Sequence, residues 1–206
     1  MTKRELDRRL LEQALTELGR EAASAGKLID ISVYGGSCLL LTTDARRITK
    51  DVDVAIANDA SFLHDAAQRV GARLDLPGDW LNDGVRTYLS PADEDARELF
   101  GSYPNETTPG LRVYLPSPEY LLAMKLMAMR IDAASGAKYL DDILTLTRML
   151  RIDRPDLLID IAAGFYPEAR VSGKLRLALD ALWREKERRD RDGSPVPTWQ
   201  PRRGGL

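Results

Sequence analysis

The feature that most constrains this chain is a glycine turn followed fourteen residues later by two alternating acids. The turn is Gly35-Gly36-Ser37, and the acids are Asp51 and Asp53. The segment 28–34 before the turn is short, rich in β-branched residues and ended by glycines, which predicts a β-strand. Ser37 is a suitable N-cap for a short helix that begins there.

A second strand is predicted over 52–56, and it carries the acids. Because positions two apart in a strand point to the same face, Asp51 and Asp53 are expected to project side by side from its start. Two neighbouring carboxylates repel each other unless a cation lies between them. Mg²⁺ suits such a pair, since it usually binds through one or two carboxylates plus substrate phosphates.

Phosphate binding is expected at the turn itself, where backbone N–H groups point outward at the start of a helix. Three basic residues between the turn and the acids add positive charge: Arg46, Arg47 and Lys50. A phosphate cradle joined to a metal-binding acid pair predicts metal-assisted transfer at phosphorus. Each half of this motif also has a structural interpretation, as an ordinary turn and as a solvated strand face.

Composition narrows the class of protein. The chain has 206 residues, a net charge of −2 and one cysteine, Cys38, which leaves no internal disulfide and fits the cytoplasm. We find neither a long apolar run nor a signal-peptide core, so no membrane association is expected. The single histidine, His64, makes a histidine-based metal site or catalytic triad improbable and is expected on a helix surface.

The first part of the chain predicts a scaffold around these motifs. An amphipathic helix is expected over 2–24, opened by a capping box of Thr2 and Glu5 and ended by Gly26. Trp80 is expected to be a core anchor, with base stacking as the alternative. A third strand is predicted over 111–115.

The second part predicts helices. Ser117 and Pro118 open an apolar helix whose single charged residue in the span 120–129 is Lys125. A lysine there needs an anionic partner, and two remain open: an acid of the core, or a triphosphate at the metal site. On the next helix, 137–150, Asp142 borders the apolar stripe and Asp141 points outward, so Asp142 is the better candidate for a buried acid.

These motifs resemble the nucleotidyltransferase superfamily of the DNA polymerase β type, whose signature is Gly-Ser followed by Asp-x-Asp. Three further motifs narrow the resemblance to the AbiEii/MenT-type toxins of bacterial toxin–antitoxin pairs. They are Trp80-Leu-Asn-Asp-Gly, the segment 115–126 around Lys125, and Lys138-x-x-x-Asp142. It covers roughly residues 28–150. Two departures are the missing third carboxylate on strand 111–115, and Tyr139, where relatives often have Asp.

The resemblance implies an α+β fold: a polymerase-β-like nucleotidyltransferase core, with a small mixed sheet flanked by helices, followed by a C-terminal helical bundle. The expected organisation is a core over 1–116, a bundle over 117–190 that completes the active site, and a flexible tail over 191–206. The implied reaction transfers nucleotides from an NTP, with Mg²⁺, to the 3′ acceptor end of tRNA, which blocks translation. A cognate antitoxin, either a protein or a kinase, is the further expected partner.

By motif match, Asp51 and Asp53 would hold the metal, Lys125 would neutralise the triphosphate and Asp142 would complete the catalytic set. The phosphate-binding group would contain Gly36, Ser37, Arg47 and Lys50, and Ser37 is also a candidate for regulatory phosphorylation. The alternative is a nucleotidyltransferase that acts on a small molecule, such as an aminoglycoside, or on a protein hydroxyl. A third hypothesis, a catalytically dead binding module, is disfavoured by the intact acids and lysine.

Overall fold

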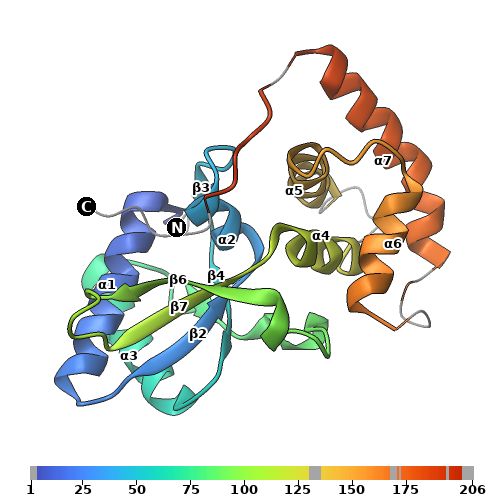
Figure 1. Cartoon of the computed structure of the whole chain (residues 1–206). Helices are drawn as coiled ribbons and strands as arrows, with labels where there is room; N and C mark the ends of the chain where they lie inside the picture. Colours follow the sequence, from blue (N-terminus) through green and yellow to red (C-terminus); the bar gives the residue numbers. More distant parts are fainter. Residues whose placement is uncertain (1–3, 130–135, 168–170, 172, 194, 201–206) are drawn as a thin grey trace. The chain divides into compact units, whose positions relative to one another are not determined.

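The computed structural model describes residues 4–129, 136–167, 171, 173–193 and 195–200, and only the backbone of 136–139, 173, 174, 176 and 177. It shows a mixed α+β protein with a sheet flanked by helices (Figure 1). The chain divides into two units. The first comprises Met1–Thr87, Arg97–Pro116 and Gln200–Leu206, and the second comprises Tyr88–Ala96 and Ser117–Trp199.

The elements of the first unit are β1 (Leu6–Asp7), α1 (Arg8–Ser24), β2 (Ile29–Val33), α2 (Gly35–Thr42), β3 (Ile48–Thr49), β4 (Val52–Ile56), α3 (Ala60–Leu74), β5 (Leu81–Asn82), most of the 3-10 helix η1 (Gly84–Tyr88), β6 (Arg97–Tyr103) and β7 (Leu111–Pro116). Those of the second are the 3-10 helix η2 (Glu94–Ala96), α4 (Pro118–Met127), α5 (Gly136–Met149), α6 (Asp156–Phe165) and α7 (Gly173–Arg191).

The sheet of the first unit has the strand order β5-β4-β2-β7-β6. It is mixed, because β2 runs antiparallel to β4 but parallel to β7, and β6 runs antiparallel to β7. The predicted strands at 28–34, 52–56 and 111–115 are therefore confirmed as its three central members. A separate two-stranded ladder pairs β1 with β3.

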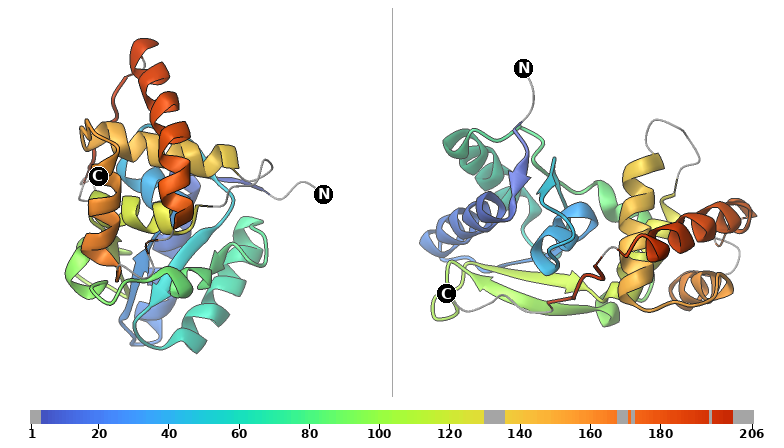
Figure 2. Two further views of the ribbon diagram at one scale, coloured as in Figure 1. Left: turned by 90° about the vertical axis from the view of Figure 1, so that its right-hand side faces the viewer. Right: turned by 90° about the horizontal axis from the view of Figure 1, so that it is seen from above.

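The two faces of this sheet differ in polarity because side chains alternate along each strand. One face is apolar and buried, with Ile29, Ile31, Val33, Val52, Val54, Leu111 and Val113. Helix α1 packs on β6, β7 and α3 on this side, and the right-hand view of Figure 2 shows α1 beside strands β6 and β7. The other face carries the polar members of the same strands, among them Asp53.

Helix α1 begins six residues later than the sequence predicted. Asp7 caps it, since its carboxylate accepts a hydrogen bond from Leu10 N at 2.7 Å, and the preceding Leu6 belongs to β1. The predicted capping residue Thr2 lies outside the described residues. The predicted end is confirmed: Gly26 has φ +66°, and the amides of Gly26 and Lys27 bond to the last carbonyls of the helix.

Trp80 is a core residue, as predicted. Its side chain is 1% exposed, and its indole N–H donates to Ala67 O at 2.9 Å. A ring held in this way inside the first unit cannot stack on a base. Its own carbonyl accepts from Val52 N, so the residue also fixes the start of β4.

In the second unit α4 packs on α5 and α6, and α5 contacts α7. The ring of Tyr120 stacks on Phe165 at 4.9 Å between centroids, and its hydroxyl accepts a hydrogen bond from Ser90 N at 2.8 Å. Burial raises the pKa of the Tyr120 hydroxyl well above its usual range. Tyr120 is therefore a structural anchor of α4.

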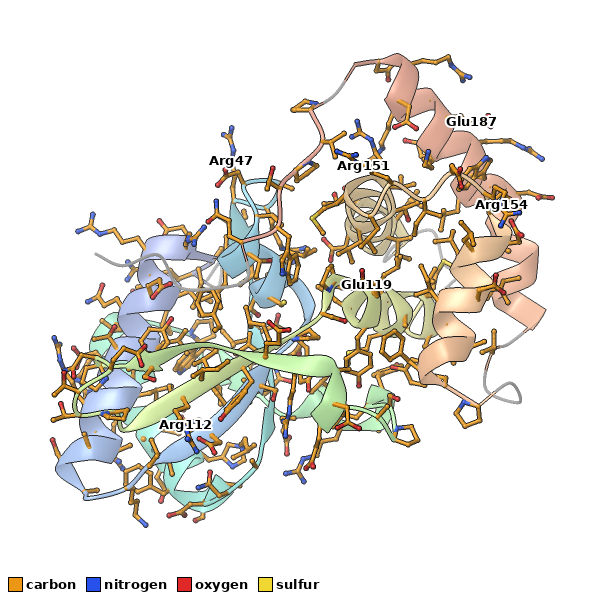
Figure 3. The ribbon with its side chains drawn as sticks, viewed as in Figure 1. Arg47, Arg112, Glu119, Arg151, Arg154 and Glu187 are labelled. Atoms are coloured by element: carbon orange, nitrogen blue, oxygen red, sulfur yellow. The ribbon has the colours of Figure 1, made fainter. Side chains whose placement is uncertain are left out.

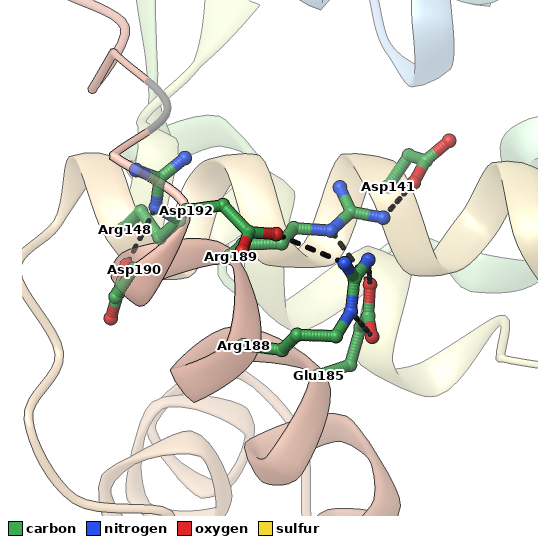
Figure 4. Close-up of polar contacts among 7 residues, drawn as sticks. All are labelled: Asp141, Arg148, Glu185, Arg188, Arg189, Asp190 and Asp192. Atoms are coloured by element: carbon green, nitrogen blue, oxygen red, sulfur yellow. Dashed lines mark hydrogen bonds and ion pairs between the residues drawn. The ribbon is translucent and has the colours of Figure 1, made fainter.

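Ion pairs tie α7 to α5 (Figure 4). Arg189 pairs with Asp141 of α5 and with Glu185, and Arg148 of α5 pairs with Asp190 at 2.8 Å. Hydrogen bonds from Arg188 and Arg189 lower the pKa of the Glu185 carboxyl to about 2. The mixed charges at the end of α7 thus form bonds between helices, which the sequence alone did not indicate.

The end of the described chain returns to the first unit. Gln200 N donates a hydrogen bond to Thr42 O at 2.8 Å, at the last residue of α2. No helix among the described residues has both the length and the apolar character needed to cross a membrane.

Candidate active site

The acid pair lies at the start of β4, on the polar face of the sheet. Asp51 directly precedes the strand and Asp53 is its second residue. Both side chains are half-buried, whereas Val52 and Val54, which alternate with them, are fully buried. The β4–β5 register places Asn82 opposite Asp53. The alternation of burial confirms that both carboxylates share one face.

The glycine turn packs directly against one of these acids. Gly35 has φ +65°, a conformation that side chains other than glycine rarely adopt, and a Cβ at this position would overlap the Asp53 carboxylate. In addition, Tyr34 N donates to Asp53 O at 2.9 Å. The acid of β4 is therefore packed directly against the turn between β2 and α2.

Ser37 does not cap α2, contrary to the sequence prediction. The helix starts two residues earlier, at Gly35, with Tyr34 as N-cap and no capping side chain. The Ser37 hydroxyl, fully buried, instead donates to Asp51 O at 3.0 Å, and Thr49 Oγ1 donates to the same carbonyl at 3.1 Å. Two hydroxyls thus fix the backbone of Asp51.

The three basic residues between turn and acids differ in placement. The guanidinium of Arg46 covers the turn, since a Cβ on Gly36 would lie 2.6 Å from Arg46 Cζ, and Arg46 Nε donates to Ile48 O at 3.1 Å. Arg47 and Lys50 are exposed, and Figure 3 shows Arg47 projecting away from the ribbon. Arg46 is therefore the cation that the fold brings to the turn, although Arg47 and Lys50 were the predicted phosphate ligands.

The donor set fits a hard divalent cation. Asp51 and Asp53 offer only oxygen ligands, and the described residues contain no group of three or more His, Cys, Asp or Glu side chains that could hold a metal. A cation bound by this pair would need further oxygens, which substrate phosphates and water supply for Mg²⁺. Zinc and iron prefer nitrogen or sulfur ligands, which the acid pair lacks.

In the second unit the structure brings together Lys125 and Asp142. Lys125 Nζ lies 2.7 Å from Asp142 Oδ2, and their side chains are only 10% and 8% exposed. Of the two partners that the sequence left open for Lys125, the structure thus provides the acid of the core. Asp141, one residue away, is exposed, as predicted for the outward-facing acid, and it forms an ion pair with Arg189 that the sequence did not predict.

The polar face of the sheet contains one residue that the sequence analysis missed. Arg97, the first residue of β6, donates from Nη1 to Ser32 Oγ at 2.6 Å and lies over the ring of Tyr114. The sequence predicted no strand here, because the segment 93–98, which overlaps the start of β6, is acidic and is typical of a solvated stretch. The available signal was the run Leu99 to Tyr103, which is apolar or aromatic at three of five positions.

Comparison with known proteins gives one likeness. No family model matches the chain, and no curated protein matches it. Among solved structures, it is similar to an antigenic nucleotidyltransferase-like protein from Paracoccidioides brasiliensis, with 19% sequence identity and a TM-score of 0.46. The match covers 91% of this chain and 94% of the other.

Proposed function

We propose that this protein is a metal-dependent nucleotidyltransferase. The observation that carries the proposal is the joined construction of turn and acids, in which Asp53 packs on Gly35 and the backbone of Asp51 is bonded to Ser37. A phosphate held by the first turn of α2 would therefore lie beside a carboxylate pair suited to Mg²⁺. Such a pairing serves transfer of a nucleotidyl group, where charge at phosphorus must be neutralised.

The roles of the residues follow from this placement. Asp51 and Asp53 would hold the metal, which when bound would neutralise charge on the phosphates of an NTP. The amides of the turn at Gly36 would bind phosphate, with Arg46 adding positive charge and the exposed Arg47 and Lys50 attracting the polyphosphate. An ionised Asp53 would also be suited to accept the proton of the attacking hydroxyl.

Lys125 and Asp142 enter the proposal through the motif match, as triphosphate ligand and supporting acid. The side chains of Lys138 and Tyr139, which belong to the same motif, lie outside the described residues. The short bond between Lys125 and Asp142 supports a narrower statement: within the second unit the lysine and the carboxylate are partners in one buried ion pair.

We further propose that the acceptor is the 3′ end of tRNA and that the protein is a toxin with a cognate antitoxin. The support is the resemblance of the motifs around Asp51, Lys125 and Asp142. The alternative acceptor is a small molecule or a protein hydroxyl, which would use the same donor chemistry. Arg130, which would extend a basic surface for tRNA, lies outside the described residues.

The decisive experiment incubates the protein with Mg²⁺, each labelled NTP and total tRNA, and in parallel with aminoglycosides. Label on tRNA that disappears with Asp53→Asn supports the proposal. The matched control is Asp30→Asn, which removes a carboxylate from the same sheet face, where Asp30 is held by Arg112 through two bonds of 2.7 and 2.6 Å. Transfer that survives Asp53→Asn would refute the site, and label on an aminoglycoside alone would refute the tRNA acceptor.

Ser37 remains a proposed site of regulatory phosphorylation, with a condition set by its burial. Its hydroxyl is fully buried and bonded to Asp51 O, so a kinase would need the first turn of α2 to open. A phosphate on Ser37 would place about two negative charges beside the acid pair and repel an anionic nucleotide. Mass spectrometry of the protein from its native cell, with Ser37→Ala as control, tests this role.

A further inference from the structure

Arg97 is brought to the polar face of the sheet by strand order. It lies on the edge strand β6, opposite Pro116 of β7. Its guanidinium carbon lies 5.7 Å from the centroid of the Tyr114 ring, and its Nη1 reaches Ser32 Oγ on β2 at 2.6 Å. The side chain therefore crosses β7 and ends over the strand that neighbours the acid-bearing β4.

The register shows how near this guanidinium is to the acid pair. Ser32 lies opposite Ala55 of β4, and Ala55 shares a face with Asp53, two residues away. Diagonal neighbours on adjacent antiparallel strands are separated by about 7–8 Å between Cα atoms. A phosphate bound at the acids would thus be within reach of the long Arg97 side chain, which must come within about 3 Å of a phosphate oxygen to form a hydrogen bond.

We propose that Arg97 is a substrate-phosphate ligand, which binds through the planar fork of its guanidinium. This inference rests on the proposed function, because it takes the acid pair to be where phosphate chemistry occurs. Guanidinium groups bind phosphate oxygens in pairs and remain charged at all physiological pH values. On this face β7 offers Arg112 and Tyr114 and no carboxylate, so no acid of β7 would repel a phosphate bound there.

A cation there also selects among acceptors. It attracts an anionic acceptor such as a nucleic acid and repels a polycationic one such as an aminoglycoside. The phosphate bound by Arg97 could belong to the donor NTP or to the acceptor strand, and the two sources are separable by experiment.

The test measures binding in two arms. Equilibrium dialysis with each labelled NTP and Mg²⁺ reports the donor, and filter binding of labelled bulk tRNA reports the acceptor. Arg97→Gln is compared with Arg97→Lys, which keeps the charge but not the fork. Arg112→Gln is the matched control, because it removes a guanidinium from the same face, where Asp30 holds it. Thermal melting verifies that each variant is folded.

We expect Arg97→Gln to weaken binding in one arm about tenfold or more. The affinity of Arg97→Lys should be intermediate, and that of Arg112→Gln should be close to the affinity of the unmodified protein. Equal binding by Arg97→Gln and the unmodified chain in both arms would overturn the assignment while the proposed function stands. An unmodified chain that binds neither NTP nor tRNA would overturn both. If Arg97→Gln fails to fold, Arg97→Lys, which keeps the charge but loses the planar fork, takes its place, and binding equal to that of the unmodified chain in both arms would overturn the assignment.

Discussion

Replacing Lys125 by methionine tests the buried ion pair most directly. Lys125 Nζ and Asp142 Oδ2 are 2.7 Å apart, and neither side chain is more than 10% exposed. The variant keeps most of the side-chain volume but removes the lysine partner of the buried Asp142 carboxylate. Breaking one partner of a buried pair costs about 3–5 kcal/mol, which exceeds the packing loss expected from the change in shape.

The second variant in the series, Lys125→Met/Asp142→Leu, removes both charges. The attraction within a buried ion pair exceeds the cost of its desolvation only slightly. We therefore expect the free energy of unfolding of the double variant to lie within about 1 kcal/mol of that of the unmodified protein. The control is Arg154→Met, which removes one member of an exposed pair, at 3.8 Å and more than 60% exposure on both sides, and should cost less than about 0.5 kcal/mol.

Thermal unfolding followed by circular dichroism measures all three. For a chain of this length a loss of 3–5 kcal/mol corresponds to a Tm lowered by roughly 6–20 °C. A Lys125→Met variant with the same Tm as the unmodified protein would refute the view that the two buried charges stabilise each other. A double variant that is stable but inactive in nucleotide transfer would separate the proposed role of the pair in chemistry from its role in folding.

Three further outcomes are expected. Gly35→Ala should lower stability by about 1–2 kcal/mol, because φ is +65°, and should also abolish transfer by displacing Asp53. The control Gly164→Ala, whose added Cβ would meet nothing within 4 Å, should leave transfer unchanged. The pKa of Glu185 is lowered to about 2, so its carboxylate contributes stability above the pKa of the unfolded chain, near 4.5, and this stability is lost as the pH falls toward 2. The difference in Tm between the unmodified protein and Glu185→Gln should therefore shrink between pH 4.5 and pH 2. Ser37→Ala should cost about 1 kcal/mol through the lost bond to Asp51 O, measured by urea unfolding, and a larger activity loss than stability loss would indicate direct contact with substrate.

Local patterns predicted most of the regular structure. Alternation and β-branched residues located β2, β4 and β7, and the Ser117-Pro118 start of α4 is confirmed by the bond from Tyr120 N to Ser117 Oγ. Errors arose where a distant segment provided the bonding partner. β1 replaced the expected first turns of α1 because Leu6 pairs with Thr49, and β6 formed because β7 offered it an edge.

The candidate site divides in the same way. The positions of Asp51, Asp53 and the glycine turn could be predicted from the sequence, because the residues around them indicate a strand, a turn and a helix in succession. Arg97 was not, because its relation to Ser32 spans 65 residues and depends on strand order, which sequence periodicity does not report. The predicted capping role of Ser37 was wrong because α2 begins two residues earlier, at Gly35, so Ser37 lies inside the helix, where its hydroxyl donates to Asp51 O.

The sequence by itself determined which residues are acidic, basic or apolar along each element, and therefore which face of every strand and helix could be buried. Only the tertiary structure decided the partners: Asp53 against Gly35, Arg46 over Gly36, Arg97 on Ser32 and Lys125 on Asp142. The physical reason is that burial preference is a property of one side chain, whereas a hydrogen bond or ion pair requires two groups within about 3 Å, which the packed chain alone provides.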